Sequence, residues 1–188
     1  MRTVLDRSLL RNGGVPKTVA RTHYHIDQDF LAWDAAKVAA YYNNALLVIE
    51  NNSLRKTKNE DSENHFISVL NEIEDYYDNL YSYQKPGMIK DGVPIKWGFF
   101  TGSNKVDVVN VLKWGLRDYG FIDYDVRLFH ECDTYEIDTN GKYNAVAGEH
   151  DDIIMSTAIG LYVSSQMDTP RIVENVVGRA RANVTLNI

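Results

Sequence analysis

The stretch ALLVIENNSL, residues 45–54, decides which fold class the sequence favours. Its first five residues are all apolar, which is typical of a central strand whose two faces are both covered. The preceding residues 30–42 carry apolar side chains at near-helical spacing after the candidate N-caps Asp27 and Asp29. A helix that leads into a buried strand predicts an α/β architecture. The strand also ends on a carboxylate, Glu50, and this position needs a chemical explanation.

The remaining segments extend this alternation. Strands are expected at residues 2–10 and 15–24, which flank the turn Asn12-Gly13-Gly14 as a hairpin, at 93–100 and near 142–148. Helices are expected at residues 65–83, from Ser103 or Asn104 to about 118, within 124–137 and after Gly148. Residues 51–64 are polar without apolar periodicity, so they predict an exposed loop.

Helical spacing also predicts which side chains face the core. The expected inward residues are Phe30, Trp33, Ala36, Val38 and Ala40 in the first helix, Phe66, Val69, Leu70, Ile73, Tyr77 and Leu80 in the second, Val106, Val109, Leu112, Trp114 and Leu116 in the third, and Leu128, Cys132 and Tyr135 in the fourth. The last helix is apolar and carries the small residues Ser156, Ala158 and Gly160. We therefore expect this helix to pack closely on a sheet.

Length and composition bound the class of protein. With 188 residues, of which 44% are hydrophobic, we expect one domain at residues 1–168 and a weakly patterned tail at 169–188. A net charge of −6 argues against a general attraction to nucleic acid, although 20 Lys and Arg leave room for a local basic strip. The single cysteine, Cys132, excludes an internal disulfide and a Cys-rich zinc site. No apolar run approaches the roughly 20 residues that span a bilayer, so we expect a cytoplasmic protein.

Three carboxylates carry the chemical signal. Glu50 would stand at the carboxyl end of a buried strand, where open α/β sheets form their ligand crevices. Asp151 and Asp152 precede the apolar helix, so they would reach the same edge if that helix lies on the sheet. Oxygen ligands of this kind suit Mg²⁺ or Mn²⁺. The alternatives are that the Asp pair caps the helix, and that Glu50 ends the strand and bonds the next loop.

Other enzyme classes lack support in the sequence. It contains no phosphate-binding P-loop and no dinucleotide glycine fingerprint, so nucleotide hydrolysis is not indicated. It also lacks the G-x-S-x-G elbow, and Cys132 has no evident base partner. Covalent catalysis therefore has no candidate nucleophile.

Two motifs together resemble a known family. YYNNALLVIENNSL is followed, about a hundred residues later, by GEHDDIIMSTAIGLYV. In this order, and with the segment at residues 97–137 between them, they resemble the nuclease domain of the large terminase subunit of tailed bacteriophages. The resemblance implies a ribonuclease-H-like mixed sheet with helices on both faces. It covers most of residues 1–165.

The resemblance also implies a set of site residues. Glu50, with Asn52 in the following loop, matches the family's second acidic position. Asp151 and Asp152 match the third, and His150 would orient or assist them. Glu131 matches a glutamate in the family's later segment.

By resemblance, the expected function is metal-dependent endonucleolytic cutting of concatemeric double-stranded viral DNA during packaging. The expected cofactors are two Mg²⁺ or Mn²⁺ ions held by carboxylates. Lys105, Lys113 and Arg117 are candidate DNA phosphate contacts, with a solvated helix face as the alternative. The implied partners are double-stranded DNA, the portal protein, the small terminase subunit and an amino-terminal ATPase domain, and the implied location is the cytoplasm of a bacterial host.

The sequence departs from the family pattern at its start. Met1 begins at what resembles the family's second strand, so we expect the first strand and its catalytic aspartate to be missing, and Asp6 lies in the wrong strand to replace it. A chain with an incomplete ligand set is expected to bind metal weakly and to cut poorly or not at all. Two other functions stay open: a non-catalytic module that docks on portal or DNA, and a resolvase-like or transposase-like nuclease.

Overall fold

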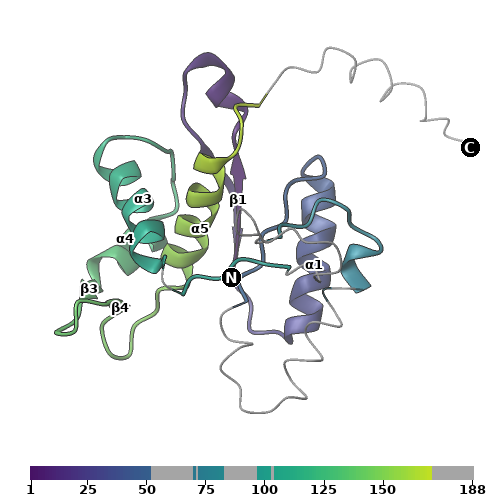
Figure 1. Ribbon diagram of the computed structural model, residues 1–188. Helices are drawn as coiled ribbons and strands as arrows, with labels where there is room; N and C mark the ends of the chain where they lie inside the picture. The colour runs from purple at the N-terminus through teal and green to yellow at the C-terminus, as the bar shows by residue number, and fades with distance from the viewer. Residues whose placement is uncertain (52–69, 71, 83–96, 103, 171–188) are drawn as a thin grey trace, which may run out of the picture.

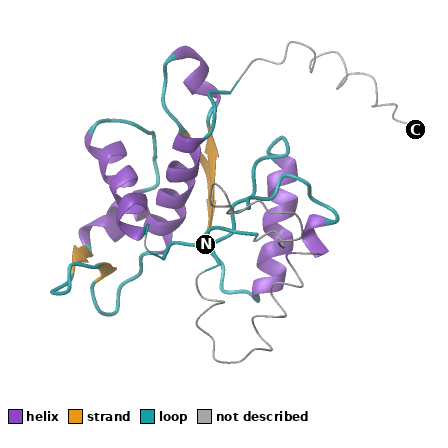
Figure 2. Ribbon diagram, viewed as in Figure 1, coloured by secondary structure: helices purple, strands orange, loops and turns teal. Residues whose placement is uncertain are grey.

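The computed structural model describes residues 1–51, 70, 72–82, 97–102 and 104–170. Helices and strands are mixed along this part of the chain, which confirms the expected α/β class (Figure 2). The elements are β1 (Arg2–Asp6), the short 3₁₀ helix η1 (Ser8–Asn12), β2 (Lys17–Thr22), α1 (Gln28–Tyr41), α3 (Lys105–Arg117), α4 (Val126–Asp133), β3 (Tyr135–Ile137), β4 (Tyr143–Ala145) and α5 (Asp152–Gln166).

The two amino-terminal strands pair as an antiparallel hairpin, but the first ends at Asp6 and not at residue 10, because residues 8–12 form the 3₁₀ helix η1 in place of a tight turn. β1 and β2 pair in antiparallel register, with Arg2 opposite Thr22 and an irregularity between Val4 and Leu5. Gly13 ends η1 with a φ of 75°, a left-handed conformation that glycine adopts without steric cost. A second small antiparallel sheet, β3 with β4, lies near the amino-terminal end of α5 (Figure 1).

β1 lies between α5 and α1 (Figure 1). On the α5 side, the hydroxyl oxygens of Thr3 and Ser156 are 2.9 Å apart, and a Cβ added to Gly160 would stand 2.8 Å from a methyl carbon of Leu5. On the α1 side, Arg2 forms an ion pair with Asp34. The small residues of α5 therefore permit the close packing on a strand that the sequence predicts.

Residues 45–50 run as an extended inner segment where the sequence predicts a strand, but they pair through isolated β-bridges and not as a continuous strand. Leu47 bridges Leu80 and Glu50 bridges Phe99, and both bridges are parallel. Leu47 packs in a cluster with the buried alanines of α1, whereas its neighbours Leu46 and Val48 pack against the cluster that holds α3, α4 and α5. Both faces of the segment are thus covered, as its continuous apolar run predicts.

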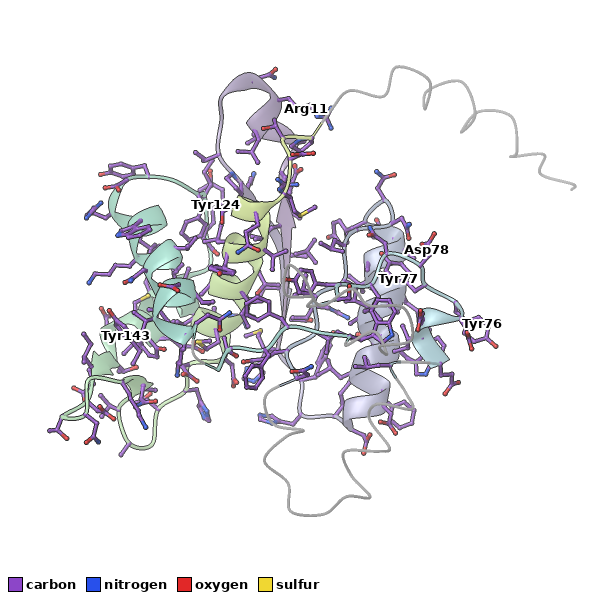
Figure 3. The ribbon with its side chains drawn as sticks, in the orientation of Figure 1. Arg11, Tyr76, Tyr77, Asp78, Tyr124 and Tyr143 are labelled. Carbon is purple, nitrogen blue, oxygen red and sulfur yellow. The ribbon has the colours of Figure 1, made fainter. Side chains whose placement is uncertain are left out.

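The helix expected at residues 65–83 is wrong at its carboxyl end. Residues 72–74 are helical, but Leu80 and Ser82 form β-bridges, with Leu47 and with Trp97. Tyr77 is buried and donates its hydroxyl to the carbonyl of Ala45, whereas Tyr76 is 77% exposed (Figure 3). Pairing with a distant strand overrides the local helical spacing here, and such pairing leaves no signal within the segment itself.

The expected core faces need correction in two of the helices, α1 and α3. Phe30, Val106 and Trp114 are 74%, 48% and 52% exposed, and Ala40 is exposed as well. The prediction is confirmed for Ala36, Val109 and Leu112, which are buried, and the core also contains Ala32, Ala35 and Ala39 of α1 and Val108 of α3, which were not predicted. The helix expected within residues 124–137 ends at Asp133, because Tyr135 pairs with Ala145 in the small sheet. None of the described helices is both long and apolar enough to cross a membrane.

Candidate functional site

Glu50 lies at the carboxyl end of the extended segment 45–50, where it forms a parallel β-bridge with Phe99. The backbone hydrogen bonds around it run from Asn51 N to Phe99 O, at 2.9 Å, and from Phe99 N to Ile49 O, at 2.6 Å. Its side chain accepts a hydrogen bond from the hydroxyl of Thr101, a residue that is 2% exposed. The strand register thus holds the Glu50 carboxylate beside the segment that leads into α3.

Asp151 and Asp152 stand at the amino-terminal end of α5. Asp151 occupies the N-cap position, but no cap hydrogen bond from its side chain occurs within the described part of the chain. It faces Lys105 instead, at 3.6 Å, while Asp152 faces Nε2 of His23, at 3.7 Å. The side chains of Asp151 and Asp152 are 33% and 50% exposed, so both remain accessible to solvent.

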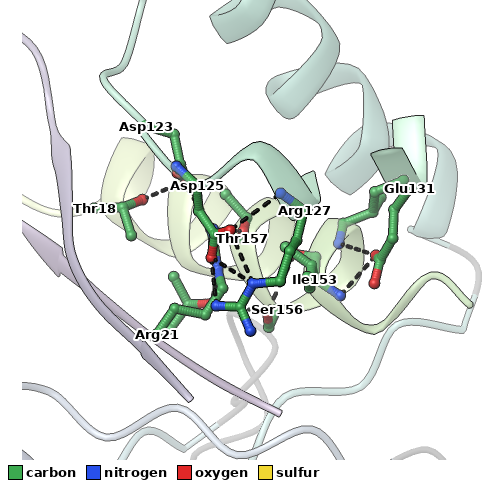
Figure 4. A network of polar contacts seen from close by, with 11 residues as sticks. Thr18, Arg21, Asp123, Asp125, Arg127, Glu131, Ile153, Ser156 and Thr157 are labelled. Carbon is green, nitrogen blue, oxygen red and sulfur yellow. Dashed lines mark hydrogen bonds and ion pairs between the residues drawn. The ribbon is translucent and has the colours of Figure 1, made fainter. Parts of the chain in front are cut away.

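The capping function belongs to Glu131, which lies on α4. Its Oε2 accepts hydrogen bonds from the backbone N–H groups of Ile153, at 2.8 Å, and Ile154, at 3.0 Å (Figure 4). Unpaired N–H groups at a helix start attract an anion, and here a carboxylate of the protein itself occupies that position. The capping alternative thus holds for position, with Asp151 at the N-cap and Asp152 as an acidic residue in the first turn, but the side-chain hydrogen bonds of a cap come from Glu131.

The two acidic regions meet the same end of α3. Thr101, the partner of Glu50, lies four residues before Lys105, the partner of Asp151 and the first residue of α3. A single short segment thus touches both carboxylates. The expected approach of Glu50 and Asp151 to each other stays a prediction.

The pKa of the Glu131 carboxyl is raised overall, chiefly by burial and also by the nearby charges of Asp152 and Asp151. The two backbone hydrogen bonds oppose this shift only in part. Tyr135, beside this cluster, is affected in the same direction, because burial and the charge of Asp151 raise its pKa above the usual range. The amino-terminal end of α5 thus concentrates negative charge that the fold only partly compensates.

Replacing Glu131 with glutamine should therefore change how stability depends on pH. A carboxyl whose pKa is raised in the folded state holds its proton more tightly than in the unfolded chain, so its contribution to stability falls as pH rises from the ordinary value of 4.5 through the folded value. We expect Glu131→Gln to be more stable than the wild type above that window, by about 0.5 kcal/mol or less, and equal to it below. Urea unfolding from pH 4 to pH 8 tests this.

The donor chemistry suits a hard cation, but the placement does not complete a site. Among the residues that the structure describes, no group of three or more His, Cys, Asp and Glu side chains is arranged to hold a metal ion. Glu50, Asp151 and Asp152 each face a side chain of the protein. A joint metal site of these carboxylates stays a prediction, and no reaction step is assigned to a metal. Asn52 lies outside the described residues, and His150 is exposed beside Asp151.

The three basic residues of α3 fall into two groups. Lys105 lies against Asp151 and over the ring of Tyr135, 5.9 Å from its centroid. Lys113 and Arg117 lie on the exposed face of the helix, and Arg117 pairs with its neighbour Asp118. Lys105 therefore has a carboxylate partner that competes with a phosphate, and Lys113 is the better placed phosphate contact.

Sequence reasoning missed two basic residues. His23 contacts Asp152 at the start of α5, and Arg21 of β2 pairs with Asp123. Their signal was present in part, because the strand expected at residues 15–24 would put Arg21 and His23 on one face, although β2 ends at Thr22, one residue before His23. What the sequence did not contain was their partners, which lie about a hundred residues away: Asp152 for His23 and Asp123 for Arg21.

The comparisons with known proteins leave the family open. A scan against models of protein families found no match to this sequence, and a search of the curated proteins found none either. The resemblance to terminase nuclease domains therefore rests on the sequence motifs alone.

Proposed function

We propose that this chain is a ribonuclease-H-like nuclease domain that cuts double-stranded DNA, of the kind found in the large terminase subunit of tailed bacteriophages. The observation that carries the proposal is the position of Glu50 at the carboxyl end of a segment with parallel β-bridges, with Thr101 and Lys105 linking it to Asp151. Strand ends of this type are where α/β folds gather functional groups. The element order, from hairpin through α1 and the inner strand to α5, also supports it.

In this proposal the site residues divide into two sets. Glu50, Asp151 and Asp152 supply the negative charge on which Mg²⁺- or Mn²⁺-dependent phosphodiester hydrolysis depends. Lys113 and Arg117, which face outward on α3, approach the DNA backbone. The proposed setting is DNA packaging in a bacterial cytoplasm, with portal protein, small terminase subunit and an ATPase domain as partners.

Plasmid nicking in Mn²⁺ tests the proposal. With protein in excess over supercoiled plasmid, we expect slow nicking that Glu50→Ala reduces by at least about 100-fold, because a lost carboxylate ligand removes several kcal/mol of transition-state stabilisation. Asp107→Ala, an exposed acidic residue in the first turn of α3, is the matched control and should nick at the wild-type rate. Nicking that survives Glu50→Ala would exclude this site.

A second candidate function is a docking module without catalytic activity. It is favoured by the outer face of α3, where Val106 and Trp114 are 48% and 52% exposed beside Lys113. No Mn²⁺-dependent nicking by the wild type, together with capture of purified portal protein that Trp114→Ala abolishes, would favour docking over cleavage.

A further inference from the structure

Arg21 of β2 is the centre of a buried polar network (Figure 4). Its side chain is 2% exposed and that of Asp123 is 1% exposed, with 2.7 Å between NH2 and Oδ2 and 3.2 Å between NH1 and Oδ1. NH1 also approaches Oδ2 of Asp125, at 3.1 Å, and NH2 donates to Oγ1 of Thr157, at 2.9 Å. Nε donates to Oγ1 of Thr3, at 3.3 Å. All three nitrogens of the guanidinium group are thus engaged.

These contacts join β2 to the two helices beside the acidic cluster. Asp125 is the N-cap of α4, where its carboxylate accepts from the backbone N–H of Arg127 at 3.1 Å. Thr157 lies one helical turn after Ile153 on α5 and is fully buried. Arg21 therefore fixes the first turn of α4 and the second turn of α5 from the same side.

Glu131 makes a second polar connection between α4 and α5. It lies near the end of α4 and binds the first free N–H groups of α5, at Ile153 and Ile154. Two polar connections, one through Arg21 and one through Glu131, therefore set where α5 begins relative to α4. His23, which directly follows the last residue of β2, contacts Asp152 at the same helix start.

We propose that Arg21 is a positioning residue, which sets the start of α5 against β2 and α4 and thereby places Asp151 and Asp152. The expected effect of Arg21 on catalysis rests on the proposed function, whereas its expected effect on the position of the α5 start does not. A planar guanidinium holds several acceptors in fixed directions, and the single amine of lysine cannot do so, although it carries the same charge. The competing explanation is that the network only contributes stability.

The variants Arg21→Lys and Arg7→Lys separate these explanations. Arg7 anchors the opposite end of α5, where Nε donates to Oγ of Ser164 at 2.8 Å and NH2 donates to the carbonyls of Ser164, Met167 and Asp168 at 3.0, 3.1 and 3.0 Å. Both variants keep the charge and weaken the attachment of the same helix. Thermal unfolding gives their stabilities, and amide NMR with hydrogen exchange reports the backbone N–H groups of Ile153 and Ile154.

If Arg21 positions the helix start, Arg21→Lys accelerates exchange of the Ile153 and Ile154 N–H groups by at least about tenfold over Arg7→Lys, and shifts their resonances as the bond to Glu131 is disturbed. Nicking falls in Arg21→Lys and not in Arg7→Lys. Wild-type resonances and exchange at both amides in folded Arg21→Lys would overturn the proposal. Wild-type protein that fails to nick would contradict the proposed function only, because the amide measurement still decides the position of the helix.

A second variant keeps the test decisive if Arg21→Lys does not fold. Thr157→Val removes the bond from Arg21 to α5 but leaves the ion pair with Asp123 intact, and valine has nearly the shape of threonine. We expect the same change at the Ile153 and Ile154 N–H groups, with a smaller loss of stability. Unchanged amides in Thr157→Val would count against Arg21 as the residue that sets the helix start.

Discussion

Replacing Asp123 with alanine is expected to lower the free energy of unfolding by about 3–5 kcal/mol, because it leaves the buried charge of Arg21 without its main partner. Arginine cannot lose its proton to relieve that cost. Asp123 also accepts hydrogen bonds from Oγ1 of Thr18, at 2.8 Å, and from the backbone N–H of Asp125, at 2.9 Å, so further donors lose their acceptor. Guanidinium unfolding at pH 7 measures the loss.

Asp118→Ala is the matched control for this substitution. Asp118 also bonds an arginine, its neighbour Arg117, but the two side chains are 55% and 68% exposed. Water replaces the lost partner of an exposed ion pair, so this variant should unfold like the wild type. If Asp118→Ala and Asp123→Ala lowered the free energy of unfolding equally, burial would not explain how much the Arg21–Asp123 pair contributes to stability.

Local sequence signals predicted the elements that are built from near neighbours. The pairing of β1 with β2 was expected, although the 3₁₀ helix η1 in their connection was not, and the fit of α5 on β1 follows from its small residues, such as Gly160. The end of the second helix was not predictable in this way, because Leu80 leaves the helix to pair with Leu47. A pairing of this kind depends on a strand more than thirty residues away, so periodicity within the segment cannot reveal it.

In the candidate site, too, only the features with a local sequence signal were predicted. Glu50 and the Asp151–Asp152 pair were found from their positions beside a strand end and a helix start, and the structure places them there. The network around Arg21 was not found, because it joins residues 102 and 136 positions apart in the sequence. Buried polar groups require partners, but the sequence does not say which residue will provide them.

The second large effect is expected from Gly98→Ala, beside the strand that carries Glu50. Gly98 has a φ of 87°, and a Cβ there would stand 2.7 Å from the carbonyl oxygen of Ile49. That oxygen accepts the backbone N–H of Phe99, so the added methyl group pushes apart the two strands whose pairing places Glu50. We expect a loss of about 2–4 kcal/mol in the free energy of unfolding, from left-handed strain together with the clash.

Gly141→Ala separates these two causes. Gly141 has a similar φ of 76°, but a Cβ there meets nothing within 4 Å, so only the conformational cost of about 1–2 kcal/mol applies. The excess loss in Gly98→Ala over Gly141→Ala, measured by urea unfolding, is then the cost of contact with Ile49. If the losses were equal, the close approach of the two strands would not constrain Glu50. A larger loss in Gly98→Ala would mean that the pairing of Glu50 with Phe99 requires glycine at residue 98. That pairing brings the Glu50 carboxylate to Thr101, close in sequence to the start of α3, where Lys105 contacts Asp151.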